Sequence, residues 1–177
     1  LRALEFDRVI EALASFALTP VGKARMLAET PATDRAVVAQ ALAATSETAR
    51  YVGQNSVFPL RAGAGLAQAL EGLAVEGRPL EALQLRILAD FVASIADAQT
   101  AVGRAPGAYP ILQALVSRLA PFTDEVAAVR RAIDVNGEVM DDASPRLASI
   151  RERLRRQRTK LRTTLEQFVK GRDTAKY

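Results

Sequence analysis

The hydrophobic positions of this chain recur mostly at steps of three and four residues, the spacing that places side chains on one face of a helix. The first set is Leu4, Phe6, Val9, Ile10, Leu13, Phe16 and Ala17. It ends near Thr19-Pro20, and a second set runs from Gly22 to Leu27, before Pro31. These patterns predict one helix up to about residue 17 and a short second helix.

The middle of the chain predicts five further helices. Thr33 or Asp34 is expected to cap the first of them. Its expected inward residues are Val37, Val38, Leu42, Ala49 and Val52. Residues 53–65 hold three Gly and one Pro and predict a loop. Helices are then expected over 66–73, 80–102, 111–119 and 124–132. The 80–102 segment is apolar on much of its circumference, so we expect it at the centre of a bundle.

The periodicity changes around residue 133. Two short alternating runs, 133–135 and 138–140, flank Asn136-Gly137. Asn-Gly between such runs is a strong signal for a hairpin turn in which both residues take positive φ. The pattern predicts a small two-stranded β-hairpin near 133–140. A lone hairpin is marginally stable, so it should lean on the helices.

The last predicted helix has a narrow apolar stripe. Ser144 and Pro145 suit its cap and first helical position. The stripe consists of Leu147, Leu154, Leu161 and Phe168, spaced by sevens, with Ile150 and Leu165 beside them. Gln157 and Arg158 interrupt it. From 145 to 170 the helix would run about 39 Å. Such a stripe pairs with one partner helix, which must come from absent residues or another chain.

These patterns together predict an all-α protein. The expected architecture is a multi-helix bundle with the small hairpin and a long C-terminal helix of the lever type. Residues 1–144 are expected to form a helical core domain, and 145–177 to begin a long basic lever helix. Ala and Leu are abundant and aromatics make up 5% of the chain, which also favours helices over sheets.

Composition excludes several kinds of chemistry. The sequence has no Cys and no His, so it cannot form disulfides, thiolate or imidazole zinc sites, or His-dependent catalytic triads. Gly22-Lys23 is not a phosphate loop, because Ala24 stands where Ser or Thr would hold magnesium. An acidic cluster, Asp134, Glu138, Asp141 and Asp142, matches no known metal-loop spacing. We therefore expect no catalytic, cofactor or metal residues in this segment.

Membrane association is not expected either. No apolar run approaches the length of a transmembrane helix, and the acidic, amphipathic start does not resemble a signal peptide. The lack of Cys fits a reducing compartment. These features predict a cytoplasmic protein with no membrane partner.

Positive charge is concentrated in the last predicted helix. Residues 1–145 contain 13 Lys and Arg against 17 Asp and Glu, whereas residues 146–172 contain 10 against 2. The candidate nucleic-acid-binding residues are Arg151, Arg155, Arg156, Arg158, Lys160 and Arg162. Arg contacts phosphates well, and such charge density drives salt-dependent binding. The alternative is a solvated helix face, which the missing aromatic stacking platform favours.

Several strings together resemble one known family. They are Leu4-Glu5-Phe6-Asp7 before a helix, Gly22-Lys23, the helix around 42–49, Gly77 with Leu80 and Leu83, and Tyr109-Pro110. The most specific is the stretch 133–147, IDVNGEVMDDASPRL, followed by Ile150-Arg151. The whole chain resembles the MutS-II family, the Smr-bearing bacterial paralogues of the mismatch-repair protein MutS. The stretch 63–66 departs from the family pattern, which has an Asp before the helix.

The resemblance implies a larger parent protein. Family members have an N-terminal helical core and lever, a clamp, a MutS-type ATPase that uses ATP and magnesium, and a C-terminal Smr domain with possible endonuclease activity. They form homodimers through the ATPase region. They are linked to DNA junction binding and suppression of recombination, and to rescue of stalled, collided ribosomes. The family's catalytic residues lie in the ATPase and Smr parts, so none is assigned here.

Three hypotheses follow. In the favoured one, the segment is a non-catalytic core and lever that couples the ATPase to the clamp. In the second, the basic helix 146–172 is a DNA- or ribosome-binding module. In the third, the chain is a plain helical adaptor for protein interaction.

Overall fold

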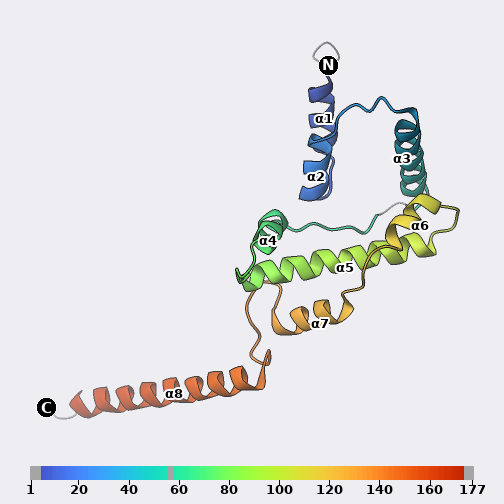
Figure 1. Cartoon of the computed structure of the whole chain (residues 1–177). Coiled ribbons are helices and arrows are strands. Elements are labelled where there is room, and N and C mark those ends of the chain that lie inside the picture. The colour runs from blue at the N-terminus through green and yellow to red at the C-terminus, as the bar shows by residue number, and fades with distance from the viewer. Residues whose placement is uncertain (1–4, 56–57, 174–177) are drawn as a thin grey trace.

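A computed structural model of the chain describes residues 5–55 and 58–173, and within these ranges it consists of eight helices without a strand. They are α1 (Phe6–Ala14), α2 (Pro20–Leu27), α3 (Arg35–Asn55), α4 (Leu66–Leu73), α5 (Ala82–Arg104), α6 (Pro110–Val116), α7 (Thr123–Ala132) and α8 (Pro145–Asp173). Figure 1 shows their arrangement. The all-α prediction is confirmed. Leu4, assigned to the first helix face, lies outside the described residues.

The helices begin at caps that the sequence supplies. The Asp34 carboxylate accepts hydrogen bonds from the backbone N–H groups of Ala36 and Val37, at 2.7 and 3.1 Å. The Ser144 hydroxyl accepts one from Leu147 N–H at 3.2 Å, one residue before Pro145 opens α8. Side-chain oxygens at these positions satisfy N–H groups that have no partner within the helix. The predicted caps at 34 and 144 are therefore confirmed.

The helix α5 is the axis on which the fold is assembled. α4, α6 and α7 pack against it, α2 contacts α4, and α3 contacts α6. Figure 1 shows α5 crossing the molecule with α7 below it and the α1–α2 pair above. Four α5 residues, Ala89, Ser94, Ala98 and Val102, are buried. The expectation that this helix lies at the centre is confirmed.

A small core lies where α3, α5 and α6 meet. Tyr51, Val102 and Tyr109 are almost fully buried there. The two tyrosine rings meet edge to face, with centroids 5.2 Å apart. Burial leaves no water for the Tyr109 hydroxyl, which instead donates a hydrogen bond to the Gln54 side chain. These contacts fix α6 against the end of α3.

The inward face predicted for α3 is wrong except at Val38, which is half-buried. Val37 and Leu42 are 54% and 62% exposed, whereas Glu47 and Tyr51 are the buried residues of this helix. The reason is that, among the described helices, α3 packs mainly on α6, which meets the C-terminal end of α3 and leaves its N-terminal half largely uncovered. Apolar periodicity identified the helix but not which side would be covered.

The predicted β-hairpin is also wrong. Within the described residues the segment forms a tight turn with one isolated antiparallel bridge, between Ile133 and Val139. Gly137 has φ +83°, but Asn136 does not take positive φ. The Asp134 carboxylate accepts the N–H groups of Asn136 and Glu138 at 2.9 and 2.8 Å. The Asp134 side chain therefore stabilises a turn longer than the two-residue turn of the predicted hairpin. After the single bridge, the chain leads into α8.

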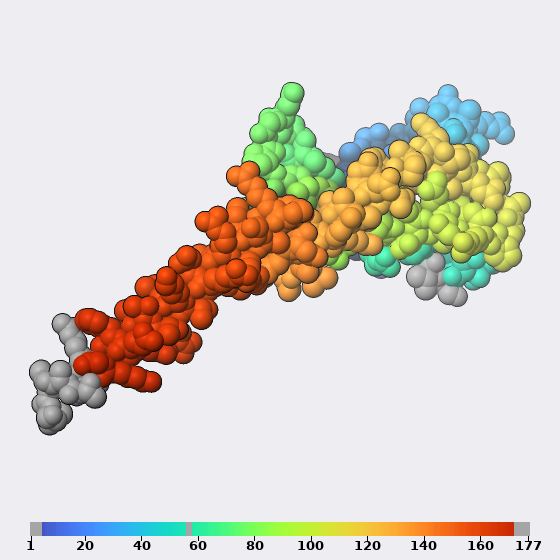
Figure 2. Space-filling view, turned by 90° about the horizontal axis from the view of Figure 1, so that it is seen from below, coloured from blue at the N-terminus to red at the C-terminus, as the bar shows by residue number. Residues whose placement is uncertain are grey.

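The 29-residue helix α8 projects away from the other helices as an arm (Figures 1 and 2). Along α8, Ile150, Leu154, Leu161 and Leu165 are about half exposed or more. The prediction of one long C-terminal helix is confirmed. Among the described helices, none has both the length and the apolar character needed to cross a membrane.

Candidate functional site

The candidate site begins at the turn that precedes α8. A Cβ atom at Gly137 would lie 2.8 Å from the Leu83 Cα atom, so the turn rests directly on the start of α5. Gly at this position therefore satisfies both the positive φ and the close approach. The N–H of Glu138, together with that of Asn136, lowers the pKa of Asp134 because both hydrogen bonds favour the carboxylate. The turn is a fixed part of the core surface.

A charged cluster ties this turn to α5 and α7. The Arg86 side chain is largely buried and donates to the Ile133 carbonyl at 2.8 Å and to Asp90 at 2.9 Å. Arg130 of α7 also binds Asp90, at 2.7 Å. Burial alone would raise the pKa of Asp90, but the hydrogen bonds from Arg130 and Arg86 outweigh it and lower the pKa. In this cluster Asp90 joins α5 to α7, and Arg86 joins α5 to the start of the turn.

The second and third turns of α8 are held by a second carboxylate. Asp141 accepts hydrogen bonds from Arg151 and from Arg155, the latter at 2.8 Å. Arg151 also donates to the Val139 carbonyl at 2.8 Å. We call this group the Asp141 clasp. The hydrogen bond from Arg151, followed by that from Arg155, lowers the pKa of Asp141, and the bond to Asp141 raises the pKa of Arg155.

The six candidate nucleic-acid-binding residues do not form one patch. Arg151, Arg155, Arg158 and Arg162 follow one another at steps of four, three and four residues and share a face. Arg156 and Lys160, with Arg153, occupy another face. These residues therefore form two arcs, one on each side of the apolar stripe, and Arg158 lies at the edge of the first arc, within the stripe itself.

Several of these cations already have anionic partners. Beyond the Asp141 clasp, Arg156 binds Glu152 and Arg162 binds Glu166, both at 2.9 Å. No ion pair of Arg153, Arg158 or Lys160 occurs within the described part of the chain. Exposed pairs of this kind are weak and exchange readily. Arg151 and Arg155 nevertheless have a structural role that charge counting did not reveal.

Sequence reasoning missed both carboxylate clusters. Asp141 precedes α8, where an acidic side chain favours the positive end of a helix, but it also binds side chains 10 and 14 residues further on. No local spacing rule predicts such a contact. The Arg86–Asp90 pair has the i,i+4 spacing that could have been found. Arg130 is 40 residues from Asp90, and only the packing of α7 on α5 brings them together.

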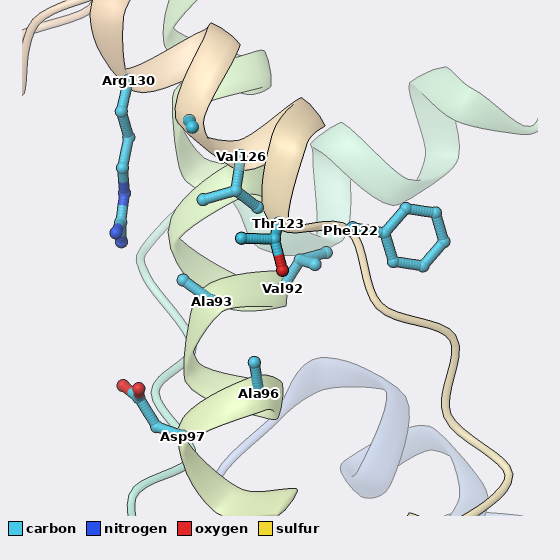
Figure 3. Close-up of a pocket in the computed structure, with 9 residues that line it drawn as sticks. Val92, Ala93, Ala96, Asp97, Phe122, Thr123, Val126 and Arg130 are labelled. Carbon is cyan, nitrogen blue, oxygen red and sulfur yellow. The ribbon is translucent and has the colours of Figure 1, made fainter. Parts of the chain in front are cut away.

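No site for a metal or cofactor emerges from these groups. In the ranges 5–55 and 58–173, no three acidic side chains converge in a way that could hold a metal ion. A hollow of about 370 Å³ lies between α5 and α7. Figure 3 shows Val126 and Thr123 of α7 near Val92 and Ala96 of α5, and Arg130 and Asp97 along one side. Asp97 is bound to Arg61 and Arg130 to Asp90, so the hollow is a mainly apolar gap between helices.

Comparison with known proteins gives related sequences over the full length of the chain. It is 37% identical over 177 residues to the endonuclease MutS2 of Symbiobacterium thermophilum, covering all of this chain. It is 32% identical over 180 residues to that of Geobacillus thermodenitrificans, and 29% identical over 182 residues to that of Listeria innocua. No protein-family model matches. The chain spans 22% of the length of each of these relatives. The match to the first of these relatives covers the whole chain, α8 included, and the chain belongs to the MutS2 family.

Proposed function

We propose that this chain is the core and the first lever segment of a MutS2-type protein, with residues 1–144 as the core and the lever beginning at 145. One observation carries the proposal. α8 leaves the core as a continuous 29-residue helix whose base is held by the Asp141 clasp. A helix fixed at one end and extended at the other can transmit a rotation of the core over its whole length. In the parent protein, it would couple an ATPase to a clamp.

The segment itself is proposed to be non-catalytic. The sequence contains no His or Cys, and Asp90 and Asp141, the carboxylates of the two charged clusters, are engaged in ion pairs. Lowered pKa values keep both carboxylates ionised, which suits structural pairing and not proton donation near neutral pH. ATP, magnesium and any endonuclease activity would belong to the rest of a cytoplasmic, homodimeric parent acting on DNA junctions or stalled ribosomes.

The test of the lever uses paired labels in the full-length parent protein. The segment has no Cys, so Thr100→Cys on α5 and Thr164→Cys on α8 can carry spin labels once other cysteines of the parent are replaced. The distance between the labels should change when a non-hydrolysable ATP analogue binds. A control pair, Thr100→Cys with Thr48→Cys on α3, should keep its distance. An unchanged α5–α8 distance, measured with bound nucleotide, would contradict the lever.

A second candidate function is contact with a polyanion through the outer face of α8. The observation that favours it is that Arg153 and Lys160 have no ion pair within the described residues, while residues 146–172 carry a large positive excess. Each phosphate contact makes the logarithm of the binding constant fall with the logarithm of the salt concentration, with a slope of about −0.9. Such contacts read charge and not base sequence.

The polyanion test changes this outer face alone. The triple variant Arg153→Gln, Arg156→Gln and Lys160→Gln leaves the Asp141 clasp intact, and Gln is a good helix former. Binding to duplex DNA and to ribosomal RNA, followed over a salt series, should weaken and lose about two to three units of slope. A matched variant on the core, Arg118→Gln with Arg104→Gln, should change neither quantity. Unchanged binding by the triple variant would leave α8 as a solvated lever face.

A further inference from the structure

The apolar stripe of α8 is largely exposed to solvent. We call Leu147, Ile150, Leu154, Leu161, Leu165 and Phe168 the α8 seam. Its central members Leu154 and Leu161 are 48% and 62% exposed, and none of the other described helices packs along it. Figure 2 shows α8 extending well clear of the core. Apolar side chains at this spacing form one half of a coiled-coil interface, and a second helix supplies the other half.

Arg158 stands inside this seam. It follows Leu154 by four residues and precedes Leu161 by three, the position at which the next apolar side chain of the stripe would lie. The side chain is exposed and forms no ion pair within the described residues. Basic residues flank the seam on both sides, Arg151 and Arg162 on one and Arg153 and Lys160 on the other. A helix that covers the seam must therefore accommodate a cation at its middle.

A second copy of this chain does not meet that requirement. If two α8 seams overlapped fully, Arg158 would face Arg158 of the other copy in a parallel pair and Gln157 in an antiparallel pair. This follows because the interruption lies midway between Leu154 and Leu161. The basic flanks would also face each other. Like charges in contact across an interface oppose association.

A nucleic acid does not match the seam face either. The middle of this face is apolar, and three of the four arginines on its adjoining arc, Arg151, Arg155 and Arg162, already bind Asp141 or Glu166. Phosphate groups would have to displace these carboxylates while leaving the leucines exposed to water. An amphipathic helix with acidic flanks would cover the leucines and offer carboxylates to the basic residues at the same time.

We propose that the α8 seam docks an amphipathic helix with acidic flanks and an Asp or Glu facing Arg158. The guanidinium of Arg158 is a planar donor that matches a carboxylate with two parallel hydrogen bonds, so the pair would fix the register of the two helices. A polar pair at one seam position specifies register and partner in coiled coils. The inference rests on the proposed function only in treating α8 as a lever that pairs with another helix.

The test uses the 177-residue chain and synthetic fluorescent helices about four heptads long. Three peptides share one leucine seam: the first has Glu flanks and Glu at the Arg158 layer, the second has Glu flanks and Leu at that layer, and the third has Lys flanks. Fluorescence anisotropy should give the tightest binding for the first peptide, by roughly tenfold over the second. The third peptide should not bind measurably.

Arg158→Leu should reverse the preference between the first two peptides, because a carboxylate would then face an apolar side chain. Arg118→Leu, on the core surface, is the matched control and should leave the order unchanged. Equal affinity of the first two peptides, no binding by any peptide, or an unchanged order in Arg158→Leu would overturn the proposal. Displacement of the first peptide by duplex DNA, with DNA binding lost in Arg158→Leu, would overturn it in favour of a nucleic-acid surface.

The peptide test and the label test fail independently. Peptide docking needs no nucleotide, so a preference reversed by Arg158→Leu would stand even if the α5–α8 label distance did not respond to an ATP analogue. Conversely, a nucleotide-dependent label distance without peptide preference would retain the lever and remove the acidic partner.

Discussion

The helices α5 and α8 are both long, yet they have opposite surroundings. α5 has 23 residues, is apolar on much of its surface and is covered by α4, α6 and α7. α8 has 29 residues, a narrow stripe and charged flanks, and extends away from the core. The difference shows that the width of the apolar surface, more than the length of the helix, decides whether a helix enters a core. Charged residues on the remaining faces would be costly to bury.

The largest expected effect is the difference in unfolding free energy between a Leu→Ala substitution in the core and the same substitution on α8. Leu66→Ala, at a fully buried position in α4 against α5, should lower the free energy of unfolding by about 2–5 kcal/mol. Leu161→Ala, on the exposed seam, should change it by less than about 0.5 kcal/mol. Urea unfolding followed by circular dichroism measures both. Similar losses at the two positions would mean that the seam is covered in solution.

The next effect concerns a buried polar group of the core. Glu47 is 7% exposed, and its carboxylate accepts the N–H of Leu112 in the first turn of α6 at 2.8 Å. Glu47→Ala should cost about 1–3 kcal/mol because this N–H loses its partner. Glu47→Gln keeps an acceptor and should cost less. Glu71→Ala, at an exposed position of α4, is the control, and an equal loss there would refute the capping role.

A smaller effect is expected at the turn that joins the two regions. Gly137→Ala should cost about 1–2 kcal/mol, because φ is +83° and a Cβ atom would press on Leu83. Gly53→Ala, inside α3 with open space around it, should stabilise the chain by about 0.5–1 kcal/mol. Thermal unfolding of the two variants should therefore shift in opposite directions. A shift of Gly137→Ala in the same direction as Gly53→Ala would place the turn away from α5.

The smallest effect is the pH dependence of the Asp141 clasp. The pKa of Asp141 is lowered from its ordinary value of 3.8, so its contribution is fully present above that value and is lost as the pH falls through the lowered pKa. NMR titration of the Asp141 carboxyl should give a midpoint below 3.8. In Arg151→Gln with Arg155→Gln the midpoint should return toward the ordinary value. A midpoint at or above 3.8 in the unaltered chain would mean that the clasp is open in solution.

Sequence reasoning predicted the helices well and their neighbours poorly. Apolar spacing and caps such as Asp34 and Ser144 are local properties, so they located α3 and α8. The burial of Glu47 in place of Val37 depends on where α6 lies, and no local sequence pattern specifies the position of α6. The Asn-Gly signal identified a turn, but the carboxylate of Asp134 selected a different turn type.

The candidate site shows the same division. The positive charge of residues 146–172 and the seam interrupted at Arg158 could be read directly from the sequence. The separation of the basic residues into two arcs follows from helical geometry once α8 is known to be continuous. The clasp could not be predicted, because Asp141 meets Arg151 and Arg155 only through the direction in which α8 leaves the turn.

The position of the Asp141 clasp, at the base of α8, has a consequence for angular precision. A straight helix of 29 residues extends about 43 Å, so a tilt of about 5° at its base moves the far end by about 4 Å. That displacement is sideways, and it is nearly half of the roughly 8–10 Å that separates the axes of two packed helices. The two ion pairs of Asp141 would therefore help to decide whether the far end of α8 lies within packing distance of a partner helix. The closure of a long interface would then depend on a carboxylate that lies outside the interface.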